Sequence, residues 1–238
     1  MITPVASLTL FLITILTLWL AMVFTLTRAF PNRAALVIVG AGAWLAATGG
    51  IPFLYAAIGW GAATQVPTLA ALAAIVTALA LGAVGRRVVA ANGIALLAAL
   101  QAFRLPLEYV LTQWSAEGFI PVQMTWNGDN FDVVTGALAA PAAALIAMGA
   151  RAWWAALLFN LLGLALLLRV ASIVALSTPT PLRALLGGYE TGPDVLIGLT
   201  FPGIWVATVG ILSALFLHLA SLRHLFRRNT EPAPYGTR

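Results

Sequence analysis

The side chains that could do chemistry gather between Gln101 and Asp132, while most of the remaining sequence is apolar. The stretch contains Arg104, which lies far from either end of its apolar segment. An arginine among carboxylates in apolar surroundings can form an ion pair, bind a ligand or take part in proton transfer. This stretch is therefore the candidate functional site. Four of the seven acidic residues of the chain lie in it: Glu108, Glu117, Asp129 and Asp132.

The elements that position this stretch must be membrane-spanning helices. The 238 residues are 62% hydrophobic and 8% charged, with a mean hydropathy of +1.00, whereas soluble domains carry about 25% charged residues. Several apolar runs are close to the ~20 residues needed to cross the hydrocarbon core of a bilayer. The runs are continuous and do not alternate with polar residues, which favours helices over a barrel. The composition predicts an all-α, polytopic membrane protein.

The residue inventory excludes several kinds of chemistry. The chain has 12 basic residues, all of them arginine, together with two histidines and no cysteine. Without cysteine there is no disulfide and no thiolate ligand for a metal, and without lysine there is no Schiff base. No basic and aromatic patch suggests nucleic acid. We expect neither a cofactor nor a metal.

The apolar runs predict seven transmembrane helices in a single domain, residues 1–222, followed by a cytoplasmic tail, residues 223–238. Prolines and glycines mark several boundaries, because proline removes a backbone donor. The predicted spans are about 4–27, 34–58, 66–84, 89–112, 132–148, 152–176 and 201–222.

The arginines predict the direction of these spans, because cytoplasmic loops of membrane proteins are enriched in basic residues. With seven spans, nine arginines fall on one side and only Arg183 on the other, which also holds Glu117, Asp129, Glu190 and Asp194. The N-terminus is therefore predicted outside and the C-terminus in the cytoplasm, in a bacterial inner membrane. The nine arginines are Arg28, Arg33, Arg86, Arg87, Arg151, Arg223, Arg227, Arg228 and Arg238.

Helical spacing predicts how the polar residues are grouped. Spacings of three and four place Gln101, Arg104 and Glu108 on one face, and that face must point into the bundle because a charge facing lipid is costly. Asp132 begins the next span, and Arg169 lies late in span 152–176. We expect these charges to converge in an outward-facing pocket beneath two long loops. The predicted ligand-binding residues are Arg104, Glu108, Asp132, Arg169, Gln101, Asn130, Trp126 and Trp205.

Three other polar features have simpler interpretations. Asn160 is nine residues before Arg169, on the opposite side of a regular helix, and is expected to make an interhelical hydrogen bond. His218, with His224 and nearby arginines, is expected to face lipid headgroups at the cytoplasmic end. The segment Asn127–Asp132 does not have EF-hand spacing, so Asn130 or Asp132 is expected to cap the following helix.

Several short segments resemble a family of uncharacterised bacterial seven-helix membrane proteins. These are Phe103–Glu108, Gly128–Asp132 with Gly136, Phe201–Trp205 and His218–Arg223. The resemblance implies the seven-helix fold but no known activity. It points to five residues: Arg104, Glu108, Asn130, Asp132 and Trp205.

Three functions remain open on the sequence alone. The leading hypothesis is binding or transport of a small polar or lipid-like ligand, with Arg104 holding an anionic group and Glu108 setting protonation or binding a cation. The second is an intramembrane, lipid-modifying enzyme with Glu108 or Asp132 as general base, although no nearby hydroxyl has a histidine beside it. The third is a structural or assembly partner that uses its long loops as a docking surface. In that case Arg104 and Glu108 belong to a buried ion-pair network without any ligand.

Overall fold

The computed structural model describes residues 4–149, 152–189 and 192–228. These residues form helices joined by short turns and loops, and they contain no strand. The main helices are α1 (Pro4–Ala29), α2 (Ala34–Ile58), α3 (Gln65–Leu81), α4 (Ala83–Ala99), α5 (Arg104–Ala116), α6 (Val133–Ala147), α7 (Trp153–Ser177) and α9 (Leu212–Arg228), with a short helix α8 (Pro181–Leu186). An all-α fold is therefore confirmed.

The helices have the length and composition of membrane spans. Six helical units among the described residues are long and apolar enough to cross a bilayer. A seventh, α6, is equally apolar but has 15 residues, which corresponds to about 22 Å of helix at 1.5 Å per residue. Large apolar side chains such as Ile38, Val39 and Phe53 are exposed on α2, as expected for a surface whose solvent is lipid.

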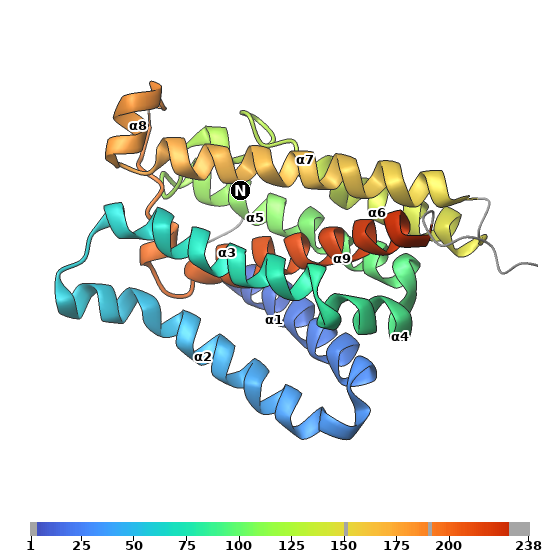
Figure 1. Ribbon diagram of the computed structural model, residues 1–238. Coiled ribbons are helices and arrows are strands. Elements are labelled where there is room, and N and C mark those ends of the chain that lie inside the picture. Colours follow the sequence, from blue (N-terminus) through green and yellow to red (C-terminus); the bar gives the residue numbers. More distant parts are fainter. Residues whose placement is uncertain (1–3, 150–151, 190–191, 229–238) are drawn as a thin grey trace, which may run out of the picture.

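The bundle has two distinct ends. At one end, Arg87 lies over the ring of Phe30 with 5.1 Å to its centroid, and Arg223 is close enough to interact electrostatically with Arg86. We call this the basic end; in Figure 1 it holds the α1–α2 and α3–α4 connections and the end of α9. At the other, the loop end, Pro4 lies beside residues 117–120 and 196–203. Of the predicted charges, Arg151, Glu190 and Arg238 lie outside the described residues.

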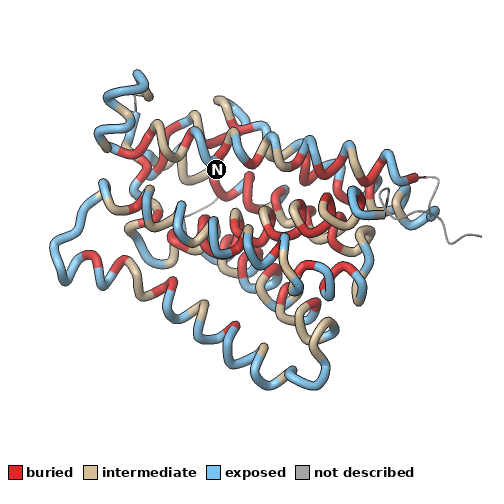
Figure 2. Tube along the Cα trace, viewed as in Figure 1, coloured by how far each residue is buried: buried red, intermediate tan, exposed pale blue. Residues whose placement is uncertain are grey.

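Helix α9 occupies the centre of the bundle and α2 its edge. Figure 2 shows mostly buried residues along α9 and mostly exposed residues along α2. In the span that contains α9, 78% of the most apolar 18-residue segment is buried, whereas the corresponding share for the span that contains α2 is 11%. A polar side chain on α9 is therefore surrounded by protein rather than by lipid.

The predicted span 89–112 is not one regular helix. Helix α4 begins earlier, at Ala83, so Arg86 and Arg87 are helical, and its axis breaks at Gly93, where φ is 75°. Glycine adopts this left-handed conformation without a Cβ penalty. A 3₁₀ turn, η3 (Leu100–Phe103), then leads into α5. This second break places Pro106 in the first turn of α5, where a missing N–H costs no helical hydrogen bond.

The last span begins with a π-helix, η7 (Val206–Ile211), before α9. Two tryptophans join it to α2: the indole of Trp44 donates to the carbonyl of Thr208 at 3.2 Å, and that of Trp205 donates to the carbonyl of Leu45 at 3.3 Å. Helix α9 continues to Arg228. The first residues of the predicted tail therefore continue this helix, and residues 229–238 lie outside the described residues.

Candidate functional site

Arg104 is the centre of a buried polar network. Its Nε donates to Oε1 of Gln101 at 3.2 Å, its Nη1 forms an ion pair with Oδ1 of Asp132, and its Nη2 contacts Nε2 of His218 at 3.1 Å. The Arg104 side chain is 2% exposed. A buried arginine requires this many partners because an unpaired charge in the interior is strongly destabilising.

The partners of His218 determine which of its nitrogens carries the proton. An arginine can only donate hydrogen bonds, so Nε2 of His218 must accept and is unprotonated. In a neutral imidazole the proton then lies on Nδ1, which donates to Oδ1 of Asn160 at 2.9 Å. The orientation of Asn160 agrees, because its Nδ2 donates to the carbonyl of Ala156 at 2.7 Å. His218 is thus a neutral link between Asn160 and Arg104.

The placement of His218 corrects a prediction from the sequence. His218 does not face lipid headgroups: it is fully buried because α9 runs through the centre of the bundle. Asn160 does make the interhelical bond that was expected, and through His218 it joins the Arg104 network. Gly163 makes room for this arrangement, since a Cβ there would overlap the imidazole of His218.

Glu108 lies one helical turn beyond Arg104 and forms the second part of the site. Its Oε2 accepts a hydrogen bond from Nδ2 of Asn130 at 2.8 Å, and the backbone amide of Trp126 also interacts with its carboxylate. Its Oε1 is buried without a partner that satisfies hydrogen-bond geometry. Glu108 is 3% exposed, so this oxygen has lost its hydration without a full replacement.

Residues 117–132 are held over Glu108 by local hydrogen bonds. Nδ2 of Asn130 also donates to the carbonyl of Met124 at 3.0 Å, and Oδ1 of Asn130 accepts from the backbone amide of Asp132 at 3.0 Å. Asp132 occupies the N-cap position of α6 without making a side-chain cap, because its carboxylate is paired with Arg104. Asp132 therefore does not cap the helix through its side chain, whereas Asn130 accepts from a backbone amide at the start of the helix.

Helix α6 packs closely on the start of α5, which brings Asp132 to Arg104. The contact depends on Gly136, where a Cβ would lie 2.9 Å from the backbone nitrogen of Leu105 and 3.1 Å from Cβ of Arg104. A larger residue would push α6 away from α5. The close packing of the two helix backbones, rather than the reach of flexible side chains, thus brings Arg104 and Asp132 within pairing distance.

Two of the predicted site residues lie elsewhere. Arg169 pairs with Asp129 at 3.2 Å and is 41% exposed, because it lies on a different face of α7 from Asn160. Tyr189 joins this pair by donating to Oδ2 of Asp129 at 2.6 Å, a bond that raises the pKa of Tyr189. Trp205 packs against α2. The expected convergence of Arg169 with Arg104 was therefore wrong.

The remaining predicted residues do come together. Gln101, Arg104, Glu108, Asn130 and Asp132 form one connected set, and Trp126 reaches it through its backbone amide. Among the described residues, no group of three or more His, Cys, Asp or Glu side chains is arranged to hold a metal ion. The set can exchange protons, pair charges and accept hydrogen bonds.

The apolar helices around this buried ionisable set define the class: an all-α, multi-pass membrane protein. No protein-family model, curated protein or solved structure matches the chain.

Proposed function

We propose that this protein binds or transports a small polar or lipid-like ligand at the network of Arg104, Asp132, Asn130 and Glu108. The observation that carries the proposal is the buried carboxylate of Glu108, whose Oε1 has no partner of full hydrogen-bond geometry among the described residues. Ionisable side chains inside a membrane usually belong to a ligand, ion or proton path.

The geometry favours Glu108 rather than Arg104 as the contact point for the ligand. Arg104 already has Gln101, Asp132 and His218 as partners, so its role is to hold Asp132 and to balance the two carboxylates. Oε1 of Glu108 can accept a hydrogen bond or a proton. The ligand is thus a molecule that brings an N–H, an O–H or a cationic group, with proton uptake by Glu108 as the simplest coupled step.

Access to this site is from the loop end. Residues 117–132 cover Glu108 through the contacts of Asn130 with Glu108 and Met124, and the ligand enters when this cover moves away. The distribution of arginines supports an orientation with the loop end outside, the N-terminus outside and the C-terminus in the cytoplasm of a bacterial cell. The pocket would then take its ligand from the outer side of the inner membrane.

Native mass spectrometry of the detergent-purified protein tests the proposal. Glu108→Gln keeps the shape of the side chain but removes its charge, and Asp194→Asn, at a 40% exposed carboxylate outside the network, is the control. The expected result is an additional stoichiometric mass on the wild type and on Asp194→Asn that is lost from Glu108→Gln. A wild type that carries no bound mass, or a mass retained by Glu108→Gln, would contradict the proposal.

A further inference from the structure

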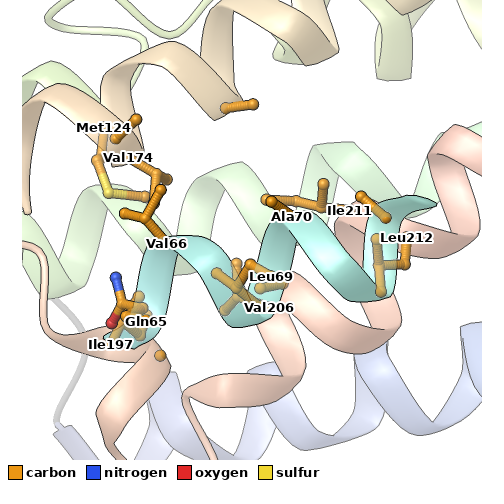
Figure 3. A pocket seen from close by; sticks show the side chains of 15 residues that line it. Gln65, Val66, Leu69, Ala70, Met124, Val174, Ile197, Val206, Ile211 and Leu212 are labelled. Atoms are coloured by element: carbon orange, nitrogen blue, oxygen red, sulfur yellow. The ribbon is translucent and has the colours of Figure 1, made fainter. Parts of the chain in front are cut away.

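A second candidate site lies on the side of the bundle, between α3 and α7. It is a groove with a cavity volume of about 200 Å³, and the N-terminal part of α9 and the π-helix η7 form its floor. Figure 3 shows side chains from these elements around the groove. Its apolar lining includes Val66, Leu69, Ala171, Val174, Val206 and Ile211.

A buried glutamine, Gln65, lies at the loop end of this groove as the first residue of α3. It is 2% exposed. Its Nε2 donates to the carbonyl of Val195 at 3.2 Å and to Oγ1 of Thr178 at 3.1 Å. The carbonyl of Val195 can only accept, so the nitrogen of the Gln65 amide must be on that side. The orientation of the amide is thereby fixed.

The other atom of the amide, Oε1 of Gln65, has no hydrogen-bond partner among the described residues. Gly198 packs against this end of the side chain, since a Cβ at that position would lie 2.7 Å from Oε1. A buried carbonyl-type oxygen without a partner is costly, and the other described residues that line the groove offer no polar side chain. A molecule that fills the groove can remove this cost only if it brings a hydrogen-bond donor to Gln65.

We propose that the groove is a binding site for a neutral lipid that carries a hydroxyl group. The alkyl chain lies along Leu69 and Ala171, and the hydroxyl donates to Oε1 of Gln65. The occupant is a lipid because the groove is apolar in a protein whose outer surface faces hydrocarbon. It is neutral because, in the part of the chain that the structure describes, no charged side chain lines the groove, so neither a phosphate nor a carboxylate would find a counter-ion there. This site is separate from Glu108 and extends beyond the function proposed above.

Binding of radiolabelled hexadecanol to the purified protein in detergent tests this site, with hexadecyl methyl ether as the matched probe. The ether keeps the chain and the oxygen but lacks the donor. We expect wild type to prefer the alcohol by roughly tenfold, the upper range for one net hydrogen bond. Gln65→Leu should abolish that preference, and Gly198→Ala, which crowds Oε1, should reduce it at least threefold.

A second pair of variants tests the position of the chain. Ala171→Trp fills the groove and should abolish binding of both probes, whereas Leu168→Trp, at a 59% exposed position on the same helix, should leave both unchanged. Equal affinity of wild type for the two probes would overturn the proposal, as would full binding by Ala171→Trp. If Gln65→Leu does not fold, an undiminished preference in Gly198→Ala overturns it. Glu108 is intact in all these variants and probe binding is measured directly, so failure of this site can be distinguished from failure of the Glu108 site.

Discussion

Arg104 and His218 meet at 3.1 Å between Nη2 and Nε2, although they are 114 residues apart in the sequence. The contact requires His218 to be neutral, because a proton on Nε2 would place a second donor and a second positive charge against the guanidinium. It therefore connects the position of Arg104, and with it Asp132, to the protonation state of a residue on the central helix.

The room for His218 depends on Gly163. We expect Gly163→Ala to lower the free energy of unfolding by about 1–3 kcal/mol, the usual cost of overpacking, because the new Cβ overlaps the imidazole. In combination with His218→Ala the overlap with the ring disappears and only the 3.0 Å approach to Cγ2 of Thr135 remains, so Gly163→Ala should cost much less in the His218→Ala background than in the wild type. Unfolding by SDS in mixed micelles measures this. Gly50→Ala, where a Cβ meets nothing within 4 Å, is the control; simple additivity of the two changes would contradict the assignment.

The Arg104–Asp132 pair should show strong coupling. Removing one partner leaves a buried, uncompensated charge, so Arg104→Met and Asp132→Leu should each cost about 3–5 kcal/mol. The double variant Arg104→Met with Asp132→Leu should lose much less than the sum of the two. The same unfolding assay gives the interaction energy, and an interaction energy near zero would show that the two side chains are not paired.

The other arginine predicted for the site should behave differently. Arg169 and Asp129 are about 40% exposed, at 41% and 39%, and exposed pairs contribute about 0.2–1 kcal/mol. Arg169→Gln should therefore lower stability by less than about 1 kcal/mol, with a smaller effect at high salt. Measurement of the variant and wild type at low and high ionic strength checks this. A loss as large as that of Arg104→Met would mean that Arg169 belongs to the buried network.

The tryptophan contacts of the π-helix should matter for stability. Trp44→Phe keeps an aromatic ring but removes the N–H that donates to the carbonyl of Thr208. We expect a loss of about 1–2 kcal/mol, since the carbonyl is left without its partner. Trp153→Phe, at a 52% exposed position, should change stability little. If the two changes lower stability equally, the hydrogen bond of Trp44 does not contribute to the stability of the bundle and the prediction is wrong.

The local part of the site could be predicted from the sequence, because Gln101, Arg104 and Glu108 are related by helical spacing. Asp132 was predicted to join them, since the following helix returns from the same end. The boundaries of α1 and α2 were also close to those predicted, because prolines, arginines and glycines mark their ends. These inferences depend only on neighbours in the chain.

The contribution of His218 could not be predicted in this way. Its neighbours in sequence are arginines and a second histidine, which favoured a surface position, and nothing local indicates that α9 is the central helix. The prediction for Arg169 failed for the opposite reason. Its position within an apolar span suggested that it is buried, but it lies on the face of α7 that points toward Asp129. The one usable signal was Gly163, three residues after Asn160, which marks a close approach whose partner only the packing reveals.

The π-helix at Val206–Ile211 has a consequence for the angular register of the central helix. A π-turn takes about one residue more than an α-turn, and one residue rotates an α-helix by about 100°. Every side chain after Ile211, including His218, is therefore turned relative to a continuous α-helix starting at Trp205. The π-helix thus determines the direction in which His218 points from the axis of α9 toward Arg104, although it lies about two turns earlier in the sequence.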